Sequence, residues 1–489
     1  MKTNICIPIV EKTIDKAKSM IIMANAKADV IELRLDFLES VDAESLVDLI
    51  AICSKPVIIT PRIDEQGGAG NLNDNNRCEL LKLGFEKNVE YVDIEYESAK
   101  QIQIVNSTKV IVSHHDFAKT PAFPQMLDIV SDMKQKPGDH YKYITKANSI
   151  NDNFNIFRLL SKQKNMISFC MGEKGQISRI LAGKYGSFIT FAALSQNQQS
   201  APGQVDFDEL IGLYNFDRID KNTEIFGLIG QFAENSKSKY MHNPVFKNNN
   251  INAVFLPFKV EPGNDLKVFI ENFRDFDFHG CAVTIPHKES IIPFLDKLDD
   301  RARIIRAVNT IKNHNGKIVG YNTDCIGAMR ALKNDTVLTN KRVLVFGAGG
   351  AARAIVFGLQ QEGAKLCIAN RTFDKAQKLA KEFSVASMDI NSIVNKIDDF
   401  DIFINATSVG MYPDINNSIL EYFPKNALAM DIVYKPLKTK FLQIAEKCGC
   451  KIITGDKMLI WQAIEQQKIW TCMAPEFQFM QDAFNKIKE

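Results

Sequence analysis

The sequence predicts an α/β protein in which an N-terminal (β/α)8 barrel precedes a two-part α/β region. Up to about Leu213, eight short apolar runs alternate with helix-like stretches, and eight is the strand count of such a barrel. Further along, KRVLVFGAGGAARAIVFGLQ, which begins at Lys341, reads as a strand, a glycine-rich turn and a helix. A chain of 489 residues is too long for one core, and roughly 150 residues per domain predicts about three units.

The apolar runs place candidate catalytic residues at one end of the barrel. They are ICIPIV, DVIELRLD, PVIIT, YVDIEY, KVIVSHHD, YKYIT, NMISFCMG and GSFITFAAL. Active sites of such barrels lie at the carboxyl ends of the strands. Because Arg34, Arg62, His115 and Lys142 lie within or just after these runs, we expect a site at that end.

A polar stretch from Tyr214 to Glu224 has no apolar period and is typical of a linker, which sets a boundary near Lys221. We expect a barrel over residues 1–220, a second unit over 221–327 and a dinucleotide-binding unit over 328–454. Residues 455–489 have a helical pattern and are expected to pack back on the second unit and complete it.

The composition excludes several functional classes. Hydrophobic residues make up 45% of the chain, but no run approaches the roughly 18 apolar residues of a membrane span. Lys and Arg number 60 against 58 Asp and Glu, without basic clusters, so neither a nucleic acid nor a membrane is an expected partner. The ten cysteines form no CxxC pair and lack a histidine at metal-ligand spacing, so we expect no metal and reduced thiols. The N-terminus has neither a secretory nor a transit pattern, and a cytoplasmic location is expected, with a processed organellar protein as the alternative.

The glycine-rich turn is a dinucleotide-binding pattern. In VLVFGAGGAARA, Gly347, Gly349 and Ala352 form GxGxxA between a strand and a helix, so the backbone can approach a pyrophosphate. The next strand ends in Asn370-Arg371-Thr372, where an NAD enzyme has an acidic residue. Arg371, helped by Lys375, suits the 2′-phosphate of NADP, although alone the two cations also fit a solvated helix start. The expected cofactor residues are Gly347, Ala348, Gly349, Gly350, Ala351, Asn370, Arg371, Thr372, Thr407, Gly455 and Met458.

A series of motifs in one order extends through the second half of the chain. They are GLIG, SKSKYMHN, GCAVTIPHK, AVNT, GYNTD, GAGGAARA, NRT, NATSVGM and DIVYKP. Together they resemble shikimate dehydrogenase over essentially residues 225–489. The resemblance implies that Lys288 and Asp324 form the catalytic pair, and reduction of a ketone does need an acid that protonates the new alkoxide. For Lys288 alone, the alternative is an exposed lysine at a helix start.

The same resemblance implies a cage of short polar side chains around the hydroxyls and carboxylate of the substrate. Such groups suit a polyol, because a site built for a hydroxyl rejects analogues that lack it. Two departures occur, Ala282 where Asn is frequent and Cys325 where Gly or an aromatic residue is common. The implied cage consists of Ser236, Ser238, Thr284, Asn309, Asn322, Tyr434 and Gln462.

A second set of motifs, in the first half, consists of ELRLD, TPR, SHHDF, MG to SR and SAPGQ. Over about residues 4–213 they resemble type I 3-dehydroquinate dehydratase. The resemblance implies a Schiff base between a lysine and the substrate ketone, with a histidine that moves protons. Lys142 and Lys146 compete for the first role and His114 and His115 for the second; the KIATxAxxI pattern favours Lys142, and the position before Asp-Phe favours His115.

One position departs from the dehydratase pattern. Gln66 stands where the RxxxEGG pattern places a glutamate that orients the catalytic histidine and stabilises its positive charge. An amide can orient an imidazole but cannot stabilise imidazolium as a carboxylate does. A local register change that brings Glu65 into its place is an alternative. The other implied substrate residues are Arg34, Arg62 and Arg179 for the carboxylate and polar rim, and Glu32, Ser200 and Gln204 for hydroxyls.

The two resemblances imply consecutive reactions, from 3-dehydroquinate to 3-dehydroshikimate and then to shikimate with NADPH. One alternative is that only the dehydrogenase is active and the barrel is a scaffold or a metabolite-sensing module. Another is a regulator that has lost catalysis. The sequence leaves open the oligomeric state, channelling between the sites and the use of quinate.

Overall fold

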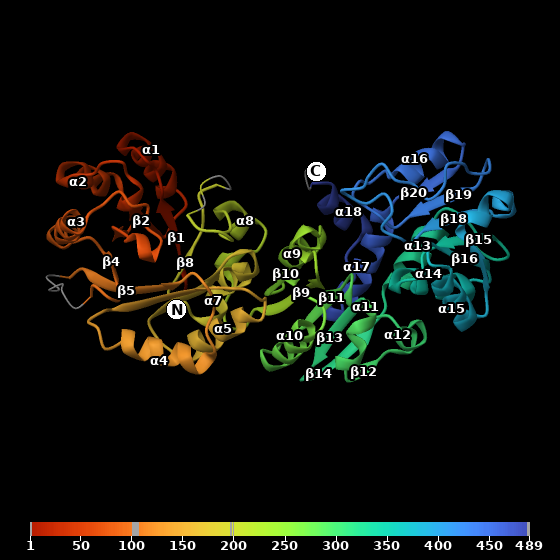
Figure 1. Cartoon of the computed structure of the whole chain (residues 1–489), viewed down its shortest axis with the longest axis horizontal. Helices are drawn as coiled ribbons and strands as arrows, with labels where there is room; N and C mark the ends of the chain where they lie inside the picture. The colour runs from red at the N-terminus through yellow and green to blue at the C-terminus, as the bar shows by residue number, and fades with distance from the viewer. Residues whose placement is uncertain (1, 100–106, 196–197, 199, 487–489) are drawn as a thin grey trace. The chain divides into compact units, whose positions relative to one another are not determined.

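The computed structural model describes residues 2–99, 107–195, 198 and 200–486, and the chain forms two compact units (Figure 1). One contains Met1–Glu224 and Asn250–Val260, and the other contains Ile225–Asn249 and Glu261–Glu489. The finer division into three domains stays a prediction.

The first unit is a near-closed barrel of eight parallel strands, as the apolar runs predict. The strands follow the order β7-β6-β5-β4-β3-β2-β1-β8, and the backbone N–H of Phe188 donates to Met166 O between the two outer strands. The strands are β1 (Asn4–Ile9), β2 (Val30–Arg34), β3 (Val57–Thr60), β4 (Tyr91–Glu95), β5 (Lys109–Asp116), β6 (His140–Lys146), β7 (Met166–Met171) and β8 (Ile189–Phe191).

The period-2 alternation of the strands builds two cores. Outward residues such as Ile7 and Ile31 pack against the surrounding helices, while inward residues such as Cys6, Ile58 and Ile111 fill the barrel interior. The helices are α1 (Ile14–Asn25), α2 (Ala43–Ile52), α3 (Asp74–Glu86), α4 (Phe123–Met133), α5 (Asp152–Lys162), α6 (Gln176–Ile180), α7 (Ala182–Tyr185) and α8 (Phe207–Gly212).

The stretch predicted as a linker is packed at its start, so this part of the prediction is wrong. Tyr214 and Phe216 are buried, and a short 3-10 helix spans Phe216–Arg218. Two aromatic rings bury enough apolar area to outweigh the polar character of their neighbours.

Two six-stranded sheets follow the barrel in sequence. The first has the order β10-β9-β11-β13-β14-β12 and mixes parallel and antiparallel pairs. Its strands are β9 (Glu224–Gly230), β10 (Ala253–Lys259), β11 (Gly280–Val283), β12 (Lys297–Leu298), β13 (Thr310–His314) and β14 (Lys317–Tyr321). The helices between them are α9 (Ser238–Asn248), α10 (Asn264–Asp275), α11 (His287–Ser290) and α12 (Asp300–Ile305).

The second sheet is the doubly wound dinucleotide-binding type that the glycine-rich turn predicts. All its strands are parallel and follow the order β17-β16-β15-β18-β19-β20. From β15 the chain first builds the sheet toward β17 and then, from β18, toward β20, and such sheets bind ligands at this switch point between β15 and β18. The strands are β15 (Arg342–Phe346), β16 (Lys365–Asn370), β17 (Ala386–Asp389), β18 (Ile402–Asn405), β19 (Leu428–Asp431) and β20 (Lys451–Ile453). The helices are α13 (Asp324–Lys333), α14 (Gly350–Gln361), α15 (Phe373–Phe383) and α16 (Lys440–Lys447).

Two C-terminal helices, α17 (Gly455–Thr471) and α18 (Phe477–Asn485), return to α9. Ile460, Ile464 and Met480 form one apolar cluster with Met241 and Val245 of α9. The indole Nε1 of Trp470 also donates to Ile311 O of β13 at 3.1 Å. The described residues of this segment, which end at 486, thus pack against the first sheet and its helix α9.

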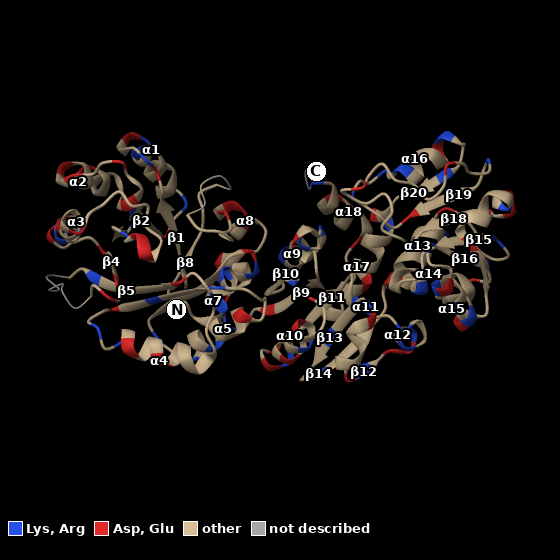
Figure 2. Ribbon diagram, in the orientation of Figure 1, with Lys and Arg blue, Asp and Glu red and all other residues tan. Residues whose placement is uncertain are grey.

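The surface charge fits the balanced composition. Lys and Arg lie interspersed with Asp and Glu over the ribbon of both units (Figure 2). Among the described residues, none of the helices is long and apolar enough to cross a bilayer.

Candidate active sites

The barrel holds a cavity of about 80 Å³ at the carboxyl ends of its strands. It gathers most of the residues that the dehydratase resemblance implies, although they come from six different segments of the chain. The lining residues are Glu32, Arg34, Arg62, Gln66, Gly67, His115, Phe117, Lys142, Ile144, Phe169, Met171, Arg179, Phe191, Ser200 and Ala201. Gln204 lies one step behind this lining, where its Oε1 accepts from the Ser200 N–H at 2.8 Å.

Lys142 is buried on the inner face of β6. Its Nζ lies 3.0 Å from Asp93 Oδ2, 3.4 Å from Glu32 Oε1 and 4.5 Å from the centroid of the Phe191 ring. Glu32 also accepts from the Thr60 hydroxyl at 3.0 Å. An amine held by fixed carboxylates in a small cavity is pre-positioned to attack a carbonyl group.

The two competing side chains lie outside this cavity. Lys146 is exposed at the end of β6. His114 points to the other face of β5, where its ring stacks on Tyr143 and its Nδ1 lies 3.4 Å from Glu97 Oε1. The geometry therefore favours Lys142 and His115.

Gln66 holds His115 at two points. Its Oε1 accepts from the His115 backbone N–H at 2.7 Å and lies 3.3 Å from Nδ1. Because an amide oxygen only accepts, Nδ1 carries the proton and Nε2 keeps its lone pair. Burial, together with the charges of Arg62 and Lys142, holds the pKa of His115 well below its usual range. Glu65 is exposed, so the alternative register is not adopted.

The three arginines of the cavity differ in their partners. Arg34 forms two bonds to the Asp36 carboxylate, at 2.9 and 2.7 Å. Arg62 lies 2.8 Å from Asp93 Oδ2. Arg179 has no carboxylate partner in the described part of the chain; its guanidinium lies 4.1 Å from the Phe169 ring centroid.

Among the described residues that line the barrel cavity, this leaves one cation, Arg179, without a neutralising carboxylate. Burial lowers the pKa of Arg179 to about 9, and its Nε has no hydrogen-bond partner in the part of the chain that the structure describes. A buried guanidinium without a counter-ion is costly unless a ligand supplies the negative charge. Arg179 is therefore the best receptor in the barrel for a substrate carboxylate.

The second site centres on Lys288 of α11 and Asp324, the first residue of α13. Lys288 Nζ lies 2.5 Å from Asp324 Oδ2, and Asn309 Nδ2 donates to Asp324 Oδ1 at 2.8 Å. Asn309 Nδ2 also lies 3.3 Å from Gln462 Oε1 of α17. Both carboxylate oxygens are thus fixed, so Asp324 holds the ammonium group of Lys288 in one place.

The remaining residues of the implied polyol cage differ in the groups that their side chains contact. The Ser236 hydroxyl donates to Ser238 Oγ at 3.0 Å and bonds to Tyr434, whose pKa burial raises. Thr284 is half-buried, and its methyl group contacts Gly230. Asn322 instead binds backbone groups: it donates to Ala307 O at 2.9 Å and accepts from the Cys325 N–H at 3.2 Å.

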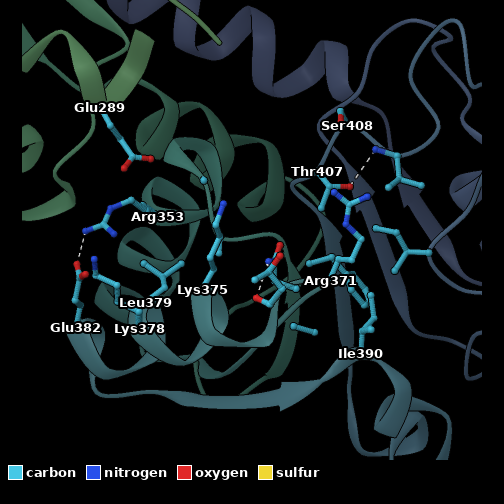
Figure 3. A pocket seen from close by; sticks show the side chains of 18 of the residues that line it. Glu289, Arg353, Arg371, Lys375, Lys378, Leu379, Glu382, Ile390, Thr407 and Ser408 are labelled. Atoms are coloured by element: carbon cyan, nitrogen blue, oxygen red, sulfur yellow. Dashed lines mark hydrogen bonds and ion pairs between the residues drawn. The ribbon is translucent and has the colours of Figure 1, made fainter. Parts of the chain in front are cut away.

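A cavity of about 650 Å³ opens over the glycine-rich turn. It is lined by the expected residues Ala348, Gly349, Asn370, Arg371, Thr372 and Thr407, and by Lys375. Figure 3 shows Arg371 close to Thr407 and Lys375 on α15 beside the same space. Neither cation forms an ion pair within the described residues, whereas Arg353 in this cavity is paired with Glu382 at 2.5 Å. The two unpaired cations suit an anionic ligand.

The turn leaves no room for a side chain at Gly347. Its φ is +115°, and a Cβ there would lie 2.9 Å from Ala406 O. Gly350 and Ala351 begin α14, whose N-terminus can bind a phosphate group. Gly455 and Met458 lie outside the cavity lining: Gly455 packs against Val433 O, and Met458 belongs to an apolar cluster.

Three polar residues of these sites are absent from the sequence prediction. Asp93 and Glu95 contact Arg62 inside the barrel, and Thr323 Oγ1 lies 2.9 Å from Asn309 Nδ2. The run YVDIEY holds a usable signal, because its period of two puts both carboxylates on one face of a strand. Thr323 adjoins Asp324, and only the fold shows which way it faces.

Three family models match consecutive parts of the chain. Residues 5–221 match the family model of type I 3-dehydroquinase, and residues 228–311 match the shikimate dehydrogenase substrate binding domain. Residues 330–433 match shikimate / quinate 5-dehydrogenase.

Two relatives extend over nearly the whole chain. The chloroplastic bifunctional 3-dehydroquinate dehydratase/shikimate dehydrogenase of Arabidopsis thaliana is 35% identical and covers 96% of this chain and 82% of its own. The shikimate biosynthesis protein AroDE of Chlamydia pneumoniae is 31% identical, with 95% of each chain covered. A crystal structure of a shikimate dehydrogenase in complex with NADP+ is 40% identical, has a TM-score of 0.53 and covers 55% of this chain and 98% of its own. The chain therefore belongs to the family of bifunctional 3-dehydroquinate dehydratase/shikimate dehydrogenases.

Proposed function

We propose that the barrel converts 3-dehydroquinate to 3-dehydroshikimate and that the second unit reduces this product to shikimate with NADPH. The observation that carries the proposal is a pair of lysines, the buried Lys142 and the half-buried Lys288, held by carboxylates at 3.0 and 2.5 Å respectively. One lysine lies in a cavity with an arginine that has no carboxylate partner among the described residues, and the other lies beside the dinucleotide turn.

For dehydration, we assign Lys142 as the group that forms a Schiff base with the substrate ketone. The iminium group withdraws electrons from the α-carbon beside the former ketone carbon and makes the C–H bond of that α-carbon acidic. His115 is neutral because of its low pKa, so Nε2 can accept a proton and return it to the departing hydroxyl. Arg179 would bind the substrate carboxylate, while Glu32 and Ser200 would contact hydroxyls.

For reduction, we assign Lys288 as the proton donor to the oxygen of the ketone. Asp324 positions its ammonium group, and Asn309 and Gln462 complete the polar wall of the site. Ser236, Ser238, Thr284 and Tyr434 would contact the hydroxyls and carboxylate of the substrate. Asn322 is a supporting residue in this proposal, since both functional groups of its side chain bind backbone atoms.

The cavity beside Gly349 fits NADP. Its volume is about 650 Å³, the turn admits a close backbone approach, and Arg371 and Lys375 can pair with a 2′-phosphate. The nicotinamide, when bound, supplies the hydride for the reduction.

We further propose a reducing, cytoplasmic-type compartment and the three-domain division at about residues 220 and 327. All ten cysteines lie in described residues and none is in a disulfide, which supports the first proposal. The packing of α17 against α9 and α13 supports a second domain that is completed by the C-terminal helices.

The coupled assay from 3-dehydroquinate with NADPH tests the whole proposal. We expect NADPH consumption that depends on added 3-dehydroquinate and yields shikimate. Reduction of 3-dehydroshikimate without any turnover of 3-dehydroquinate would refute the dehydratase assignment and leave the barrel as a scaffold.

A further inference from the structure

Asp93 is a buried carboxylate of the barrel interior that contacts Lys142, Arg62 and Ser113. It lies on the inner face of β4, and its side chain is 1% exposed. Its Oδ2 contacts both Lys142 Nζ at 3.0 Å and Arg62 at 2.8 Å, and its Oδ1 accepts from the Ser113 hydroxyl at 2.6 Å. Both oxygens are therefore held by donors from three neighbouring segments.

We propose that Asp93 is a positioning residue for the dehydratase reaction, which aims the nitrogen of Lys142 and remains its counter-ion throughout Schiff-base chemistry. The inference rests on the proposed role of Lys142. It assigns Asp93 a different task from Glu32, which lies farther from Nζ at 3.4 Å and lines the substrate cavity.

The charge balance of the reaction explains the need for a permanent counter-ion. Overall, the lysine ammonium and the ketone give an iminium ion and water: the C=O double bond is replaced by C=N, and two ammonium protons leave on the former ketone oxygen. One positive charge stands on the same nitrogen before and after this exchange. A carboxylate that stays ionised beside that nitrogen stabilises both states.

The surroundings keep Asp93 ionised. Burial alone would raise its pKa, but Arg62 and Lys142 outweigh this effect and hold the pKa of Asp93 well below its usual range. The other titratable or charged groups that face the Lys142 nitrogen are Cys6 of β1, Glu32 of β2, Arg62 after β3 and His115 of β5. Burial raises the pKa of Cys6, so this thiol stays neutral.

Glu95 offers a matched control on the same strand. It is equally buried and also contacts Arg62, at 3.4 Å, but its second oxygen binds Arg77 at 2.6 Å rather than Lys142. Asp93→Asn and Glu95→Gln both remove one buried carboxylate, and only the first removes the carboxylate nearest to the Lys142 nitrogen.

The test measures the kcat, KM and pH profile of dehydration in the full chain, with dehydrogenase activity as the concentration standard. We expect Asp93→Asn to lower kcat by about 100-fold with KM changed less than about threefold, because the bound ground state keeps its contacts. Loss of the counter-ion also favours the neutral imine, so the high-pH limb of kcat moves down by about one pH unit. Glu95→Gln should leave this limb in place.

The proposal is overturned if Asp93→Asn and Glu95→Gln lower kcat equally and the high-pH limb of kcat moves in neither variant. If Asp93→Asn does not fold, Ser113→Ala decides, because it removes the donor to Asp93 Oδ1, together with an acceptor of Arg62, and leaves every charge present. A fall in kcat of about fivefold or more supports the proposal, and an unchanged kcat overturns it. Borohydride trapping of 3-dehydroquinate on the wild-type protein distinguishes a wrong role for Asp93 from a wrong role for Lys142. If no adduct forms on Lys142, the proposed role of Lys142 is wrong, whatever the Asp93 variants show.

Discussion

The side-chain oxygen of Gln66 lies 2.7 Å from the backbone nitrogen of His115 and 3.3 Å from its Nδ1. This contact orients the imidazole without giving it a negative neighbour. His115 is thereby oriented as a neutral base, and Gln66 does not stabilise its protonated form.

Gln66→Glu should move the acidic limb of the dehydratase pH profile upward. A carboxylate beside Nδ1 raises the pKa of His115, so neutral His115 disappears at a higher pH as the solution is acidified; we expect a shift of about one pH unit. The exposed Glu65 serves as control, and Glu65→Gln should leave the profile unchanged. An identical profile and rate for Gln66→Glu would show that the contact has no electrostatic role.

Lys142→Ala should abolish Schiff-base formation and lower dehydration by about 10⁴-fold or more, the scale of losing a catalytic nucleophile. Borohydride with 3-dehydroquinate should label wild-type protein on the Lys142 peptide and leave Lys142→Ala unlabelled. Lys146→Ala should keep both the label and the activity. A label that persists in Lys142→Ala and vanishes in Lys146→Ala would reverse the assignment.

Arg179→Met should raise the KM for 3-dehydroquinate by about 100-fold, because a charge-assisted pairing with the carboxylate is lost. Its thermal unfolding midpoint should not fall, since the change removes a buried cation that has no carboxylate partner in the described chain. Arg77→Met is the contrast: Arg77 pairs with Glu95 at 2.6 Å, and its loss should cost about 3 kcal/mol of folding stability. A destabilised Arg179→Met with normal KM would contradict the carboxylate role.

Lys288→Met and Asp324→Asn should each lower the kcat of the dehydrogenase by about 10²- to 10⁴-fold and leave dehydration intact. Because the two side chains act as one pair, the double variant should lose little more than the worse single variant. Steady-state rates of both reactions on the same preparation give the comparison. If the loss of kcat in the double variant equals the product of the two single losses, Lys288 and Asp324 act independently.

Arg371→Gln should lower kcat/KM for NADPH by about 100-fold and leave kcat/KM for NADH nearly unchanged, since only the former carries the 2′-phosphate. Arg342→Gln is the control, because Arg342 is an exposed cation at the start of β15, within 4.0 Å of Asp399 and Asp401. Equal losses with both cofactors would mean that Arg371 supports the fold of the site rather than phosphate recognition.

The fold follows from local patterns because strands and glycine-rich turns are coded over a few residues. The eight apolar runs predict the eight barrel strands, and GxGxxA predicts the turn at Gly347. Lys142 could be separated from Lys146 by resemblance, and their different burial agrees with that choice.

The partners of each charge could not be predicted, because they come from strands far apart in sequence. Arg34, Arg62 and Arg179 look alike in the sequence, yet the structure neutralises the first two and leaves the third without a carboxylate. Asn322 likewise looks like a ligand residue until the fold shows that it binds backbone atoms. The packing of Tyr214 in the expected linker depends on contacts that no local pattern contains.

The position of α17 has a consequence for how the protein is made. Gln462 reaches Asn309 from a helix that is synthesised about 150 residues later, and Trp470 of the same helix bonds to β13. A ribosome-bound chain can thus complete its barrel early, while the reductase site stays open on one side until α17 has been synthesised. Premature termination in that region should leave a protein that forms 3-dehydroshikimate and cannot consume it.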